Sequence, residues 1–175
     1  MEQVHIFLDN SNLWIEGQRK AANPLAPTRH KNGSFRLDFG ELLAYVSKGR
    51  KIKEARLYGS EPPPNDTVWE KARKEGFTVN VNRRSVRGKE KQVDTQMCVD
   101  ITKAIYLNDP KERTLIILAG DRDYVPTFKE AKNRNWNIEV YFWSNASAEI
   151  KKHPDIKFID FSRDLLKVGF RAIRK

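Results

Sequence analysis

The chain has 175 residues, 39% of them hydrophobic and 32% charged, which is typical of one globular domain with a sizeable core and not of a disordered chain. No apolar run approaches the roughly 18 residues of a membrane-spanning helix, so a membrane protein is not expected. The 33 basic residues exceed the 23 acidic ones and give a net charge of +10, which favours a nucleic-acid partner, although solubility alone could also account for it.

The first third of the chain begins with an apolar strand at residues 4–8, followed by a helix at 11–22. Two prolines end that helix, and residues 23–36 are predicted as a polar loop. Apolar residues at helical spacing predict an amphipathic helix over about 38–46, and a second strand is predicted at 53–59.

The middle of the chain repeats this alternation. A helix is predicted over about 65–74, where Gly76 ends it, and a third strand is predicted at 77–81. Residues 82–91 form a strongly basic connection, and the clearest helical pattern of the chain then runs over about 94–106.

The fourth and fifth strands are predicted at 114–119 and 138–143, with a helix at 124–135 between them. The fourth strand is apolar throughout, as expected of a central strand that is covered on both faces. Regular alternation of strands and helices predicts an α/β fold in three layers, α/β/α, around a mostly parallel, five-stranded, Rossmann-like sheet.

Beyond residue 145 the pattern is weaker. A short helix around 146–151 and a small strand in the segment KFIDF are predicted, followed by a basic helical extension over about 160–175. No linker interrupts the chain, so we predict one domain over 1–175 with its core at about 3–145.

Cysteine and histidine are too few for several kinds of site. The single Cys98 excludes an internal disulfide, and His5, His30 and His153 are scattered, so no zinc cluster is expected. Because the chain begins as a strand, we expect no signal peptide and a location in the reducing cytoplasm. Neither a membrane partner nor an organic cofactor is expected, and the oligomeric state stays open, a homo-oligomer included.

Four aspartates in three separate segments are the strongest functional signal: Asp9, Asp94, Asp121 and Asp123. They fall at strand ends or at a helix start, positions that meet at the ligand-binding edge of a parallel sheet. Two carboxylates about 5 Å apart repel each other by roughly 3 kcal/mol at an effective dielectric constant near 20, so such a cluster calls for a cation. Oxygen ligands suit Mg²⁺ or Mn²⁺, and we predict that these four residues hold one or two such ions, with the amide of Asn12 aimed into the same pocket. An ion held there could activate water and cut a phosphodiester.

Each acid also has a purely structural alternative. Asp9, Asp94 and Asp123 could each cap a helix, whereas Asp121 is harder to explain in this way. Asp100 lies six residues after Asp94, about 120° away around the helix, so we expect it to be solvated or to lie behind the ligands.

Three motifs resemble the signature segments of a known family. They are DNSN at residues 9–12, KQVD at 91–94 and AGDRDYVP at 119–126, and the segment YGSEPPPND after the second strand agrees with them. In this order they resemble the NYN domain family within the PIN-like nuclease superfamily, over about residues 3–145.

The resemblance implies a PIN-like parallel sheet with strand order 3-2-1-4-5 and a metal-dependent ribonuclease activity. It places Asp9, Asn12, Asp94, Asp121 and Asp123 at the family's site positions.

The chain departs from the family pattern at three positions. Gln92 replaces a frequent Gly, and Ala119 replaces a frequent Ser whose hydroxyl could contact phosphate or water. Tyr124 replaces Phe, with no expected consequence. Some relatives bind RNA without cutting it well, so the implied activity is a hypothesis.

The basic connection lies directly before Asp94 and could hold an RNA backbone beside the metal, or be only solvated charge. Its basic residues are Arg83, Arg84, Arg87, Lys89 and Lys91. Trp14 could stack on a base, although core packing is the simpler interpretation. A second basic cluster precedes the second strand and is interpreted as surface charge at the opposite edge: Lys48, Arg50, Lys51 and Lys53.

These observations lead to one main hypothesis, a Mg²⁺- or Mn²⁺-dependent endoribonuclease that acts on single-stranded or loop RNA and leaves a 5′-phosphate. The first alternative is an RNA-binding module of the same fold that turns over poorly or not at all. The second is a DNA flap-type nuclease or a phosphatase that uses the same ions.

Overall fold

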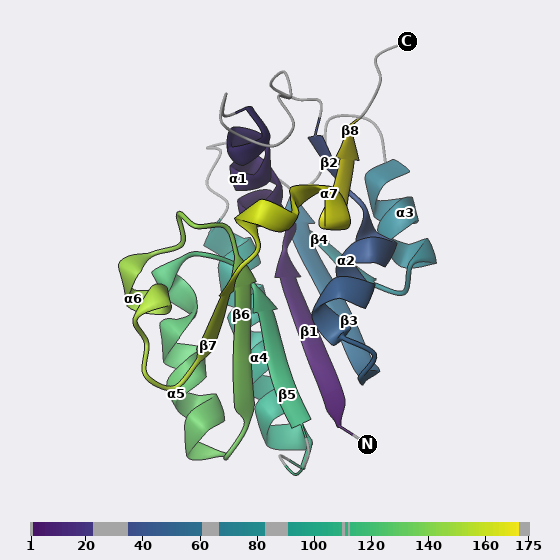
Figure 1. Cartoon of the computed structure of the whole chain (residues 1–175). Coiled ribbons are helices and arrows are strands. Elements are labelled where there is room, and N and C mark those ends of the chain that lie inside the picture. The colour runs from purple at the N-terminus through teal and green to yellow at the C-terminus, as the bar shows by residue number, and fades with distance from the viewer. Residues whose placement is uncertain are drawn as a thin grey trace.

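The computed structural model describes residues 2–22, 35–60, 67–82, 91–109, 111 and 113–171. Within them, six strands form one sheet in which all neighbouring strands are parallel, in the order β4-β3-β1-β5-β6-β7 (Figure 1). The strands are β1 (Gln3–Asp9), β3 (Lys51–Ser60), β4 (Thr78–Asn82), β5 (Arg113–Leu118), β6 (Asn137–Phe142) and β7 (Lys157–Asp160).

Helices cover both faces of this sheet and complete the three layers. One face carries α1 (Asn10–Ala22), α2 (Phe39–Ser47), α3 (Thr67–Lys74) and the short α7 (Leu165–Val168). The other face carries α4 (Lys91–Leu107), α5 (Val125–Asn133) and the short α6 (Ala148–Lys151). No helix in the described part of the chain is both long and apolar enough to cross a membrane.

The central strand β1 is buried on both faces, and its residues from Val4 to Leu8 are apolar except His5. Ile6 and Leu8 pack into the core beneath α1 and α2, whereas Phe7 points to the opposite core beneath α4. Successive side chains of a strand alternate between faces, so a strand that is covered on both sides needs apolar residues on both of them. The predicted layer arrangement is confirmed.

The sheet has six strands, so the prediction of five is wrong. The five predicted strands are present as β1, β3, β4, β5 and β6, and they keep the expected order among themselves. The sixth is β7, which lies in the segment KFIDF and pairs with β6. A small strand was predicted in this segment, and that prediction is confirmed, but the strand was not counted in the sheet because it has only four residues.

The described part of the predicted basic helical extension over about 160–175 contains only short helical segments and then a strand. A 3₁₀ turn, η2 (Ser162–Asp164), leads into α7, and the chain then becomes the strand β8 (Gly169–Arg171). This strand pairs antiparallel with β2 (Phe35–Leu37), which occupies the end of the predicted polar loop. A Cβ atom at Gly169 would lie 2.5 Å from the carbonyl oxygen of Arg36, so the close pairing requires glycine.

Candidate functional site

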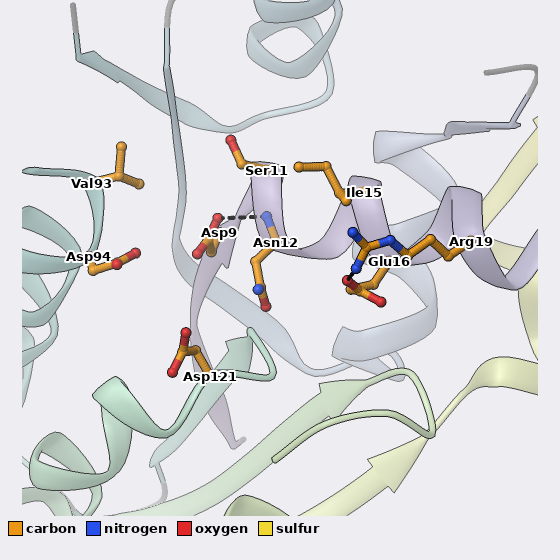
Figure 2. Close-up of a pocket in the computed structure, with 9 residues that line it drawn as sticks. All are labelled: Asp9, Ser11, Asn12, Ile15, Glu16, Arg19, Val93, Asp94 and Asp121. Carbon is orange, nitrogen blue, oxygen red and sulfur yellow. Dashed lines mark hydrogen bonds and ion pairs between the residues drawn. The ribbon is translucent and has the colours of Figure 1, made fainter. Parts of the chain in front are cut away.

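A pocket of about 220 Å³ opens at the carboxyl edge of the sheet, between the start of α1 and the start of α4 (Figure 2). Figure 2 shows the side chains of Asp9, Asn12, Asp94 and Asp121 directed toward one shared space. The complete lining is Asp9, Ser11, Asn12, Ile15, Glu16, Arg19, Val93, Asp94 and Asp121. Three of the four predicted aspartates therefore meet in one pocket, as their places at element ends suggested.

Asp9 ends β1 and is only 5% exposed. Its Oδ1 accepts a hydrogen bond from the backbone N–H of Asn12 at 3.0 Å, so it does cap the start of α1. Its Oδ2 lies 3.0 Å from the hydroxyl of Tyr124. Asp9 thus caps α1 and also lines the pocket, because its two oxygens have different partners, and its role in metal binding stays a prediction.

Asn12 links two parts of the pocket wall. Its Oδ1 accepts a hydrogen bond from the backbone N–H of Gly120 at 2.9 Å, which joins α1 to the segment after β5. A Cβ atom at Gly120 would lie 2.2 Å from the ring of Phe142, so glycine is required where this segment turns. With the amide oxygen turned to Gly120, the Asn12 side chain directs its N–H donors toward the pocket.

Asp94 lies within the first turn of α4, which begins at Lys91, so it is not the N-cap. Its Oδ1 lies 3.0 Å from the hydroxyl of Tyr124. Asp100, six residues further along α4, does not line the pocket. It is buried and accepts a hydrogen bond from Tyr58 at 3.0 Å, so it is not solvated.

Tyr124, for which no role was expected, is fully buried and lies between two of the acids. Burial and then the charges of Asp9 and Asp94 raise the pKa of its hydroxyl far above the ordinary value. The phenol therefore stays neutral and acts as a hydrogen-bond donor. Its two carboxylate contacts place one oxygen of Asp9 and one of Asp94 at most about 6 Å apart.

The last two aspartates lie in the segment after β5, but only one of them lines the pocket. Asp121 caps the 3₁₀ turn η1 (Arg122–Tyr124) by accepting from the N–H of Asp123 at 3.2 Å, and it also lines the pocket. Asp123 is exposed and does not line the pocket. A 3₁₀ turn has three residues per turn, so Asp123 and Tyr124 point in different directions, and Tyr124 takes the inward position. The predicted role of Asp123 in metal binding stays a prediction.

Two charged residues of the pocket were missed from the sequence. Glu16 and Arg19 follow Asn12 on one face of α1, at the spacing of a helix, and that spacing is the signal that could have revealed them. The guanidinium of Arg19 pairs with Glu16, and the Glu16 carboxylate also accepts from the amide of Asn145. The side chain of Arg19 is 70% exposed, so it places a cation at the outer end of an acidic pocket.

Most of the predicted RNA-binding residues cannot be placed. Arg83, Arg84, Arg87 and Lys89 lie outside the described residues, as does the side chain of Lys91. Trp14 donates its indole N–H to the carbonyl of Phe35 at 3.3 Å, and the guanidinium of Arg36 lies 5.7 Å from the ring centre. These contacts agree with the packing alternative for Trp14, and base stacking stays a prediction. Ala119, where the family pattern has Ser, is fully buried and does not line the pocket.

The pocket has the donor chemistry for a hydrated divalent ion but not for a closed metal cage. Within the described ranges, no three His, Cys, Asp or Glu side chains come close enough together to enclose an ion. Mg²⁺ keeps several waters and commonly uses one or two carboxylates plus the phosphates of a substrate. Carboxylates at the edge of an open pocket fit this mode of binding.

Comparison with known proteins identifies the family and the fold. The NYN domain family matches residues 3–166 of the chain. A crystal structure of a protein of unknown function from Vibrio parahaemolyticus RIMD 2210633 superposes with a TM-score of 0.67 at 16% identity, covering 92% of this chain and 94% of that one. At this identity the likeness concerns the fold alone. No curated protein is significantly similar to the chain.

Proposed function

Because the chain belongs to the NYN domain family of PIN-like nucleases, which supports a ribonuclease role in general, we propose that it is a divalent-metal-dependent endoribonuclease for single-stranded or loop RNA. The observation that carries this proposal is the meeting of Asp9, Asp94 and Asp121, from three distant segments, in one pocket at the carboxyl edge of the sheet. Such an edge is where α/β folds bind ligands.

The contacts suggest a separate role for each side chain. Asp9, Asp94 and Asp121 would hold one or two ions of Mg²⁺ or Mn²⁺. A bound ion supplies a Lewis acid, which polarises a phosphate oxygen and lowers the pKa of water. Asn12 would donate its amide N–H groups to a phosphate oxygen or to the attacking water, since its oxygen already accepts from Gly120. Hydrolysis by water in line with the departing 3′-oxygen leaves a 5′-phosphate on the product.

The charge of the chain supports a polyanionic substrate. The net charge of +10 draws RNA to the protein, and the acidic pocket then needs a cation before a phosphate can enter it. Arg19 at the outer end of the pocket is placed to contact a neighbouring phosphate, and the basic connection before Asp94 would add further contacts.

Cleavage of end-labelled RNA tests this proposal. We expect cutting with Mg²⁺ or Mn²⁺, none with EDTA, and at least about a 100-fold loss in a protein carrying both Asp94→Asn and Asp121→Asn, because loss of a contact to transition-state charge acts on this scale. Asp109→Asn plus Asp155→Asn is the matched control, since it makes the same charge change outside the pocket. Undiminished cutting by the pocket variant would reject the mechanism.

A second candidate is an RNA-binding module with little or no turnover. The observation in its favour is that no three potential ligands within the described ranges enclose an ion. RNA binding that survives EDTA, without cleavage of any RNA tried, would support this candidate. Single-stranded DNA of matching sequence tests the remaining alternative, because a DNA flap-type nuclease would cut it at least as fast as RNA.

A further inference from the structure

The hydroxyl of Tyr124 joins two parts of the chain that are remote in sequence. It lies 3.0 Å from an oxygen of Asp9, at the end of β1, and 3.0 Å from an oxygen of Asp94, in the first turn of α4. Its ring is fully buried in the core beneath α4, together with Met97 and Phe128. The hydroxyl is therefore held at a fixed place between the two carboxylates by the packing of the ring.

A buried hydroxyl at this place orients both acids, because its single proton is shared between the two carboxylate oxygens or alternates between them. A carboxylate that accepts a hydrogen bond from a rigidly packed group loses rotational freedom, and its remaining lone pairs point in a defined direction. Asp9 is oriented twice, by the N–H of Asn12 on one oxygen and by Tyr124 on the other. The orientation of Asp94 depends on α4, whose start is tied by Tyr124 to the strand edge.

Phenylalanine would fill the same volume at position 124 but would supply no donor. The ring packs in an apolar cluster, which Phe satisfies equally well, so the hydroxyl is not needed to fill the core. What the hydroxyl adds is the pair of contacts to the two pocket acids.

We propose that Tyr124 is a positioning residue of the metal site, whose hydroxyl holds Asp9 and Asp94 in the arrangement that binds the divalent ion. This inference rests on the proposed function. Outer groups that hydrogen-bond to metal ligands typically change metal affinity by about 10- to 100-fold when they are removed.

The test is Tyr124→Phe, with Tyr58→Phe as the matched control. Tyr58 is also buried and also donates at 3.0 Å to an aspartate of α4, but that aspartate, Asp100, lies outside the pocket. Both variants lose one buried tyrosine hydroxyl that donates its proton to aspartate, so a general loss of stability affects them alike. Only Tyr124→Phe removes a contact to pocket acids.

Mn²⁺ binding to the whole chain, followed by electron paramagnetic resonance of the free ion, gives the affinity without any dependence on activity. We expect Tyr124→Phe to raise the Kd for Mn²⁺ by about 10- to 100-fold and Tyr58→Phe to leave it unchanged. As a second measurement, the rise in Tm that saturating Mn²⁺ produces should be smaller in Tyr124→Phe than in the other two proteins.

The possible failures are distinguishable. An unchanged or lower Kd in Tyr124→Phe, with Mn²⁺ bound normally by the unaltered protein, would overturn the role of Tyr124 and leave the proposed function standing. Equal weakening in both variants would also overturn it, because the effect would then come from stability. If the unaltered protein bound no Mn²⁺, the metal-dependent function itself would be overturned.

Discussion

The two polar groups of the Asn12 side chain serve different purposes: the oxygen stabilises the fold and the N–H groups face the pocket. Its oxygen accepts from Gly120 and fixes the turn after β5, which leaves its N–H groups for a ligand. Asp9 and Asp121 combine two roles in a similar way, since each caps a local turn and also lines the pocket. A residue that caps a helix is therefore not excluded from a functional role when its two oxygens have different surroundings.

The pKa of the Cys98 thiol depends on two of the predicted acids, Asp94 and Asp123. Burial first, and then the charges of Asp94 and Asp123, raise the pKa of its thiol from 9.0 to about 11. A raised pKa leaves less of the reactive thiolate at a given pH, so at pH 8 the folded protein should contain about 100-fold less thiolate than the unfolded chain.

Labelling by iodoacetamide, followed by mass spectrometry, measures this difference. The rate in the folded protein should be at least about 100-fold below that in urea at pH 8. It should still rise nearly tenfold between pH 9 and pH 10, where the rate in the unfolded chain levels off. A folded rate that levels off near pH 9 would contradict the raised pKa.

Strands whose buried residues are nearly all apolar were predictable from the sequence alone. The central strands β1 and β5 are buried on both faces, so their composition identified them, and the acids at their ends identified the carboxyl edge. By contrast, β8 is a strand because it pairs with β2, more than 130 residues earlier in the chain, and local patterns carry no sign of that pairing.

The candidate site was predictable to a similar extent. Position at an element end was enough to select Asp9, Asp94 and Asp121, because it depends only on where a strand or helix stops or starts. The sequence did not show in which direction each side chain of the turn after β5 points. For that reason Asp123 was grouped with the other acids and Tyr124 was overlooked. Glu16 and Arg19 could be found only by helical spacing along α1, counted from a residue such as Asn12 that was already expected to face the pocket.

The basic connection before α4 is predicted to bind the phosphates of RNA. Replacing Arg83, Arg84 and Arg87 together by Gln should weaken RNA binding across sequences, because the contacts are to phosphate. It should also flatten the slope of log affinity against log salt by about 0.7 for each phosphate contact that is lost.

Filter binding or fluorescence anisotropy at several salt concentrations measures both effects. Replacement of Lys48, Lys51 and Lys53 by Gln is the control, since it removes the same charge near the amino end of β3, at the opposite edge of the sheet. An unchanged salt slope in the arginine variant, or equal flattening in both, would show that the connection does not contact RNA.

Across the whole molecule, a strongly basic chain surrounds an acidic pocket. The surplus of positive charge acts at long range and is not specific for sequence, whereas the pocket acids act over a few ångströms. A divalent ion bound in the pocket would allow a phosphate to approach carboxylates that otherwise repel it. The central claim is therefore that the pocket binds such an ion.

Anomalous X-ray scattering from crystals soaked in Mn²⁺ tests that claim most directly, because it locates the ion without any assay of activity. We expect an anomalous peak inside the pocket, in contact with a carboxylate oxygen of at least one of Asp9, Asp94 and Asp121. A pocket without a peak, in crystals where manganese is bound at other places on the chain, would contradict it.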